Sequence, residues 1–166
     1  QLLALPVVPA QLQAELDAAR AHFARKERCI FCDVLAQELR DRSRVVAEND
    51  GFVVLSPYAA RSPFELMVLP REHRSSFERS TGPELRAFAA ALRTALGKLD
   101  LALENPPFNF WLHTLPLREP PSDSFHFHLE LKPVLALHAG FEWGSGLTIN
   151  PTPPEEAAAF LRQTEA

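Results

Sequence analysis

The stretch Phe125-His126-Phe127-His128-Leu129-Glu130-Leu131 alternates apolar and polar residues without a break. Successive side chains of a β-strand point to opposite faces, so this period of two predicts a half-buried strand. The expected core face consists of Phe125, Phe127, Leu129 and Leu131, and the expected polar face of His126, His128, Glu130 and Lys132. Imidazole and carboxylate groups bind metal ions, transfer protons or bind phosphate. The alternative is an exposed strand face whose two histidines have no function.

The length and composition predict one soluble domain over residues 1–166. A chain of 166 residues with 46% hydrophobic residues can bury one sizeable core. Its formal net charge is -4 and it has no run rich in Lys and Arg, which argues against a nucleic-acid partner. A small anionic ligand would therefore be held by local groups.

No apolar stretch approaches the length of a membrane span, so we expect no membrane partner. The apolar start, residues 2–6, lacks a basic flank and breaks at Pro6, unlike a signal peptide. These features predict a cytoplasmic location. The first residue is Gln1, which suggests a fragment.

The order of local patterns predicts an α+β fold with an antiparallel sheet and flanking helices. Apolar residues at helical spacing indicate a first helix that ends at residues 25–28, and helical pattern resumes after Cys32. Three strands in succession indicate a meander: residues 45–48, 51–55 and 64–69.

The second half of the chain begins with the longest amphipathic helix. Residues 81–84 have the form of a capping box, and the apolar pattern continues to Leu103, so this helix should cover one face of the sheet. A strand over residues 108–113 and a polar loop over residues 114–124 lead to the histidine stretch. A second capping box at residues 152–155 predicts a final helix over roughly residues 153–163.

The two cysteines form a Cys29-Ile30-Phe31-Cys32 pair, which cannot build a disulfide framework. Such a pair supplies two of the four ligands of a tetrahedral zinc ion. With no third cysteine, histidines must complete the site, and His73 and His126 are the candidates. The alternatives are a redox-active dithiol or two packed free cysteines.

His128 and Glu130 then remain on the polar face for a substrate. A neutral imidazole can attack a phosphate or act as its general acid or base, so His128 is the candidate catalytic residue. His113 could join it from the neighbouring strand. Alternatively His113, His126 and His128 could form a second metal cluster, which would compete for His126. His22 and His138 have the pattern of ordinary surface or loop histidines.

Several separated motifs together resemble the C-terminal half of galactose-1-phosphate uridylyltransferases, a family of the histidine-triad superfamily. The resemblance covers nearly the whole chain and is closest to the branch with zinc-bearing hexose-1-phosphate uridylyltransferases and ADP-glucose phosphorylases. It is carried by Ala4-Leu5-Pro6-Val7-Val8-Pro9, Cys29-x-x-Cys32, residues 57–70, Pro107-Phe108-Asn109-Phe110-Trp111-Leu112-His113, His126-Phe127-His128, Ala139-Gly140-Phe141-Glu142 and Asn150-Pro151.

This resemblance implies a histidine-triad-like half of a two-half enzyme, in which Cys29, Cys32, His73 and His126 bind zinc. The family's covalent nucleophile belongs to a His-Pro-His-x-Gln motif of the first half, and Gln1 resembles its last residue. Glu130 stands where smaller triad hydrolases have a third histidine. The resemblance also places Phe141 and Glu142 near sugar hydroxyls, and Asn109 and His113 near the histidine strands. It implies a homodimer.

We therefore predict a nucleotidyltransferase that acts on nucleotide sugars and sugar phosphates, with zinc as cofactor, or its C-terminal half. One alternative is a non-catalytic, zinc-stabilised module that binds nucleotide sugars or mediates dimerisation. Another is a stand-alone histidine-triad hydrolase that uses His128.

Overall fold

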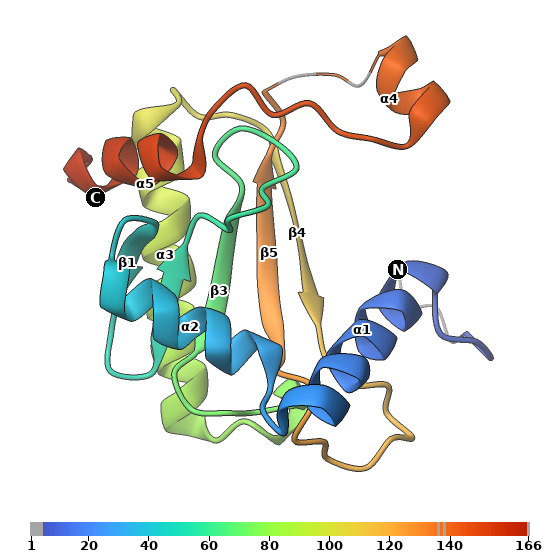
Figure 1. The fold of residues 1–166 in the computed structure, drawn as a ribbon. Helices are drawn as coiled ribbons and strands as arrows, with labels where there is room; N and C mark the ends of the chain where they lie inside the picture. The colour runs from blue at the N-terminus through green and yellow to red at the C-terminus, as the bar shows by residue number, and fades with distance from the viewer. Residues whose placement is uncertain (1–4, 136, 138, 166) are drawn as a thin grey trace.

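The computed structural model describes residues 5–135, 137 and 139–165. Figure 1 shows a central sheet between two layers of helices. In chain order the elements are α1 (Ala10–Lys26), α2 (Ile30–Asp41), β1 (Val45–Glu48), β2 (Phe52–Leu55), β3 (Leu66–Pro70), the 3-10 turn η1 (Phe77–Arg79), α3 (Gly82–Ala102), β4 (Phe108–His113), β5 (His128–Pro133), α4 (Gly140–Ser145) and α5 (Pro154–Gln163). Among these residues, no helix is long and apolar enough to cross a membrane.

The strands form one antiparallel sheet in the order β1-β2-β3-β5-β4. The predicted α+β fold, the meander of β1 to β3 and the strand over residues 108–113 are confirmed. In the last ladder, His113 lies opposite His128, Trp111 opposite Glu130 and Asn109 opposite Lys132. Because these pairs share one face, the polar residues of β4 and β5 form a continuous row.

The long helix α3 covers one face of the sheet, as its amphipathic pattern predicts. Its buried residues Ala91, Ala95 and Leu99 pack with Phe127 and the apolar side of β5. The predicted capping box is present: the Thr81 hydroxyl accepts from the Glu84 N–H, and the Glu84 carboxylate accepts from the Thr81 N–H at 2.7 Å. These bonds satisfy two backbone donors that the first helical turn leaves unpaired.

The opposite face of the sheet is covered by α1 and α2 (Figure 1). Leu35 of α2 packs against Val45 and Val53. Leu16 and Ala19 of α1 form a separate cluster with Phe125 and a residue of the loop after β4. Helices therefore cover both faces of the sheet, and the polar row of β4 and β5 lies on the face that α1 and α2 cover.

The histidine stretch departs from its prediction at its start. The strand β5 begins at His128, and the Phe127 N–H bonds the Arg74 carbonyl at 2.7 Å. Phe125 packs with α1, on the side of His128, so its expected place on the Phe127 face is wrong. The alternation fails because residues 125–127 lie outside the ladder that imposes the period of two.

Other predicted boundaries also shift. Helix α2 begins at Ile30 with Cys29 as its N-cap, so Cys32 lies inside the first turn rather than before the helix. The proposed cap at residues 152–155 is wrong, because Pro153 is the N-cap of α5 and no side-chain cap bond forms. The short helix α4 was not predicted. The inferences on Gln1 and His138 concern positions outside the described residues.

Candidate functional site: two clusters of metal-binding residues

Cys29, Cys32, His73 and His126 converge in the structure. One ligand atom of each lies within 4.8 Å of those of the other three. The cysteines come from the start of α2, His73 from the segment after β3, and His126 from the residues just before β5. Bond lengths of about 2.3 Å to sulfur and 2.0–2.1 Å to nitrogen place the ligand atoms of tetrahedral zinc roughly 3.3–3.8 Å apart. A small contraction of the cluster would reach that geometry.

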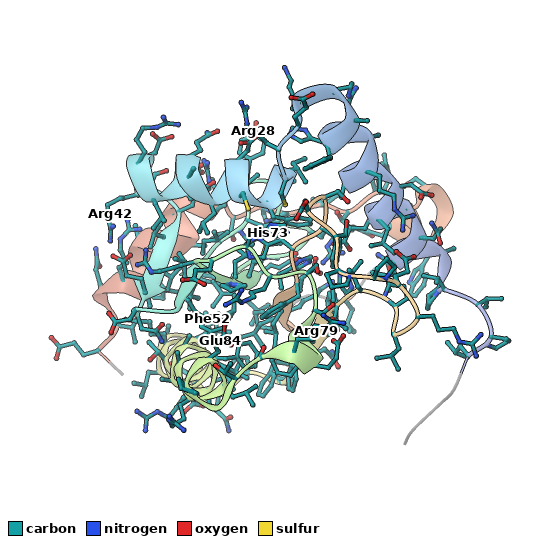
Figure 2. All side chains as sticks on the ribbon, turned by 90° about the horizontal axis from the view of Figure 1, so that it is seen from below. Arg28, Arg42, Phe52, His73, Arg79 and Glu84 are labelled. Carbon is teal, nitrogen blue, oxygen red and sulfur yellow. The ribbon has the colours of Figure 1, made fainter. Side chains whose placement is uncertain are left out.

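The hydrogen bonds of His73 leave the correct nitrogen free for a metal ion. Its Nε2 lies 3.0 Å from the Ser122 carbonyl oxygen, to which it donates, so the lone pair is on Nδ1. That Nδ1 lies 3.3 Å from the Cys32 sulfur, and the Nδ1 of His126 lies 3.5 Å from the same sulfur. Figure 2 shows His73 beneath the first turn of α2.

The electrostatics of this group also fit a cation. Burial, together with the charges of His73 and His128, lowers the pKa of His126 to about 3, so its imidazole is neutral at pH 7. Burial raises the pKa of Cys29, but the His73 ring and nearby backbone N–H groups outweigh burial and lower it. Burial and the Cys29 thiolate raise the pKa of Cys32 to about 12. A bound metal would supply the positive charge that a second thiolate needs.

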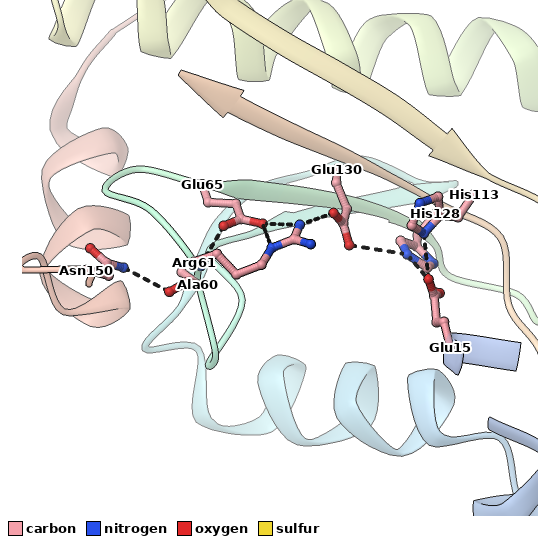
Figure 3. Close-up of polar contacts among 8 residues, drawn as sticks. All are labelled: Glu15, Ala60, Arg61, Glu65, His113, His128, Glu130 and Asn150. Carbon is pink, nitrogen blue, oxygen red and sulfur yellow. Dashed lines mark hydrogen bonds and ion pairs between the residues drawn. The ribbon is translucent and has the colours of Figure 1, made fainter. Parts of the chain in front are cut away.

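A second group consists of Glu15, His113 and His128, whose ligand atoms also lie within 4.8 Å of one another. The Glu15 carboxylate lies 2.7 Å from Nδ1 of His113 and 3.4 Å from Nε2 of His128 (Figure 3). Its charge raises the pKa of His113. The sequence reasoning missed Glu15. The available signal was a carboxylate on the buried face of the first helix, beside Leu12 and Leu16.

From the sequence, His126 could belong either to the cysteine group or to a cluster with His113 and His128, and the structure places it in the cysteine group. His126 lies with the cysteines, and His113 and His128 lie with Glu15. Within the described residues, the cluster of His113, His126 and His128 therefore does not form. His126 precedes β5, which begins at His128, so the strand period of two does not hold His126 on the face of His128.

The ring of His128 is enclosed and only 1% exposed. The ring centroids of Phe31, His113 and Phe125 lie 4.7, 5.1 and 6.1 Å from its own. Its Nδ1 donates to the His126 carbonyl at 3.0 Å, so its other nitrogen faces Glu15. The side chain that resembles a catalytic histidine is thus packed inside the fold.

A chain of ion pairs continues along the same face. Arg61, from the loop between β2 and β3, bridges Glu65 and Glu130, and Glu130 also faces His128 at 3.8 Å (Figure 3). Burial raises the pKa of Glu130, but His128 and Arg61 outweigh burial and lower it to about 2. The sequence reasoning left Glu130 for a substrate and missed Arg61 and Glu65, because nothing in their local pattern marks them.

The other predicted substrate residues are divided between two places. Asn109 is exposed on β4, on the face that carries His113. Phe141, 53% exposed, and Glu142 belong to α4. In Figure 1 this helix projects beyond the end of the sheet opposite to the end that α1 covers. The structure therefore does not bring Phe141 and Glu142 to His128 of the same chain.

Comparisons with known proteins agree with this architecture. The family model described as galactose-1-phosphate uridyl transferase, C-terminal domain, matches residues 15–158. The chain is 33% identical to an ADP-glucose phosphorylase of Arabidopsis thaliana, over 98% of this chain and 46% of that protein. It is also 33% identical to a galactose-1-phosphate uridylyltransferase of Thermotoga maritima, over 99% of this chain and 54% of that protein.

Solved structures give the same result. The Arabidopsis ADP-glucose phosphorylase with bound ADP-glucose superposes with a TM-score of 0.88 at 32% identity, over 98% of this chain and 52% of that one. A zinc-bound histidine triad protein from Mycobacterium smegmatis, 18% identical over 81% of this chain and 90% of that one, has a TM-score of 0.54 and shares the fold. The chain spans about half the length of the curated relatives. The chain thus belongs to the galactose-1-phosphate uridylyltransferase family, of which it carries the C-terminal domain.

Proposed function

We propose that this domain is the C-terminal half of a cytoplasmic hexose-1-phosphate nucleotidyltransferase, an enzyme that moves a nucleoside monophosphate between sugar phosphates. The relatives are named as galactose-1-phosphate uridylyltransferases and an ADP-glucose phosphorylase, and they are about twice as long as this chain. In this proposal the first half supplies the covalent nucleophile. The present half supports it and contributes substrate contacts.

The observation that carries this proposal is the enclosure of His128. A histidine that attacks phosphorus needs a free nitrogen within about 3–3.5 Å of the phosphorus atom. His128 donates from one nitrogen to a backbone carbonyl and faces Glu15 with the other, beneath Phe31. This packing favours a supporting role for His128 and disfavours the stand-alone hydrolase.

Zinc fits the group of Cys29, Cys32, His73 and His126. Four protein ligands close the coordination sphere, which is typical of a structural site and leaves no position for a substrate. The ion would join the start of α2 to the segment after β3 and to β5. Purified protein should contain one equivalent of zinc, and Cys32→Ser should lose it. Retention of that metal in Cys32→Ser would contradict the assignment.

Glu15, His113 and His128 offer three further ligand atoms. A total of two equivalents of divalent metal, reduced to one by Glu15→Gln, would show that this group also holds an ion. A total of one equivalent would show that this group holds no second ion. The matched control is Glu27→Gln, just beyond the end of α1.

We further propose that Phe141 and Glu142 serve a nucleotide-sugar site on a partner subunit of a homodimer. Their helix projects from the body of the domain (Figure 1), and the neighbouring Trp143 is 78% exposed. Light scattering should give twice the monomer mass. Phe141→Ala should weaken nucleotide-sugar binding without changing thermal stability, because its side chain is largely exposed.

The decisive experiment compares this chain alone with the same chain joined to a first half from the family. We expect nucleotidyl transfer between hexose 1-phosphates in the joined protein and none in the chain alone. Turnover by the chain alone, abolished by His128→Ala, would establish the hydrolase instead. Binding of a nucleotide sugar with no transfer in either protein would establish the non-catalytic module.

A further inference from the structure

A depression of about 490 Å³ lies on the polar face of β4 and β5, beside His113. Its walls come from α1, from the loop that carries Arg61, from the two strands and from the segment after α4. Its lining residues are Gln11, Arg61, Trp111, His113, Lys132 and Thr148. This volume lies within the range of sites for small molecules, roughly 300–1,000 Å³.

Two cationic side chains line this depression with unused hydrogen-bond donors. Lys132 is half-buried and makes no ion pair with the described residues. Arg61 uses Nε and Nη2 for Glu65 and Glu130, so its Nη1 forms no hydrogen bond within the described part of the chain. The carboxylates that hold Arg61 are buried and do not line the depression. The lining therefore presents the Lys132 ammonium and the Nη1 group of Arg61, and the carboxylates that pair with Arg61 lie outside the lining.

The remaining lining groups suit a sugar. The indole of Trp111 is half-buried, and the Arg61 guanidinium carbon lies 5.5 Å from a ring centroid. A large aromatic side chain with an accessible surface can pack against the C–H groups of a sugar ring. The Gln11 amide and the Thr148 hydroxyl can each donate and accept hydrogen bonds with sugar hydroxyls. Cationic, aromatic and neutral polar groups thus converge on one space.

We propose that this depression binds a phosphorylated monosaccharide, with the phosphate on Lys132 and Arg61 Nη1 and the sugar ring against Trp111. The choice of a hexose phosphate rests on the proposed function, which assigns the nucleophile to the other half. The residues that line the depression all belong to the present half and would bind the ligand rather than attack it. Ion pairs between Lys or Arg and phosphate supply the affinity, and Trp111 supplies the preference for a sugar.

The test is calorimetric titration of the whole chain with glucose 1-phosphate, with inorganic phosphate and with glucose. We expect saturable binding of glucose 1-phosphate by the wild type. Lys132→Gln should weaken this binding about tenfold, because it removes one charge-assisted contact with the phosphate. Trp111→Leu should weaken glucose 1-phosphate about tenfold and leave phosphate binding within about twofold. The matched control is Lys26→Gln, in the last turn of α1, which should leave both affinities unchanged.

Three results would overturn the proposal. They are no saturable binding of glucose 1-phosphate, the same affinity in Lys132→Gln as in the wild type, or a loss of affinity in Lys26→Gln as large as that in Lys132→Gln. Circular dichroism checks that each variant folds, and if Trp111→Leu does not, Lys132→Gln still decides. No binding of glucose 1-phosphate by the chain alone, with transfer intact in a joined two-half protein, would refute this site alone. Saturable binding by the chain alone, weakened by Lys132→Gln, with no transfer in the joined protein would refute the proposed function alone.

Discussion

Replacing Glu38 by glutamine should break a buried ion pair that holds the cysteine-bearing helix α2 to the rest of the domain. The Glu38 carboxylate accepts from Arg44 Nε at 2.9 Å and from Nη2 at 2.6 Å. The two side chains are 3% and 10% exposed. Arg44 Nη1 also bonds Glu155 of α5, whose side chain is 44% exposed. One arginine therefore has a buried partner and an exposed one.

Removing one partner of a buried ion pair costs about 3–5 kcal/mol, because the other charge stays buried. We expect the lower end, about 3 kcal/mol, for Glu38→Gln, since glutamine still offers an oxygen and Glu155 still neutralises part of the charge. Glu155→Gln is the matched control. The Glu155 carboxylate contacts Arg44 directly but its side chain is 44% exposed, so solvent screens the pair and we expect a loss below about 1 kcal/mol.

The assays are urea unfolding, which gives the free energy of unfolding, and thermal unfolding, which gives Tm, both followed by circular dichroism for the two variants. For a domain of this length, about 3 kcal/mol corresponds to a decrease of roughly 6–12 °C in Tm, against roughly 2–4 °C or less for the control. Because Cys29 and Cys32 lie at the start of α2, release of the proposed zinc ion on heating should shift with Tm in Glu38→Gln. Equal losses in the two variants, or a loss below about 1 kcal/mol in Glu38→Gln, would refute the reasoning.

Three further predictions follow from the packing, the cap and the proposed metal centre. Phe127 packs against Phe52 and Phe77 in the core beneath α3, so Phe127→Ala should lower the free energy of unfolding by about 3–5 kcal/mol, measured by denaturant unfolding. A decrease below about 1.5 kcal/mol would contradict this packing. The backbone and hydroxyl of Thr81, together with Arg74, lower the pKa of Glu84 to about 2. The stabilisation from the cap is thus complete above the ordinary pKa of 4.5 and is lost as pH falls toward 2. NMR titration of Thr81→Val should show the Glu84 pKa rising part of the way toward 4.5, because the backbone N–H of residue 81 still donates, and an unchanged pKa would exclude the Thr81 hydroxyl as a cause. A chelator should lower the Tm of the wild type and not that of Cys32→Ser, and equal decreases would place the metal elsewhere.

The sequence was informative for several segments that carry their own pattern, although the capping-box pattern at residues 152–155 was misleading. The alternation of β5 from His128 onward, the amphipathic period of α3 and the capping box at Thr81 are local, and the structure confirms each of them. The grouping of Cys29, Cys32, His73 and His126 was also predicted, from ligand chemistry and from the family resemblance, and these side chains do converge. Their binding of zinc remains a prediction.

What only the tertiary structure decided is which side chains from distant segments meet. Glu15 reaches His113 and His128 because α1 packs across the end of β4 and β5, and Arg61 reaches Glu130 because its loop folds over the same face. Phe125 left its predicted face because no ladder holds it. The periodicity of a segment indicates which of its side chains face the core and which face solvent. The partners of a buried charge depend instead on how separate segments pack together. The sequence therefore determined the strand from His128 onward, the long helices and the cysteine pair, and packing determined that His128 is enclosed rather than presented to a substrate.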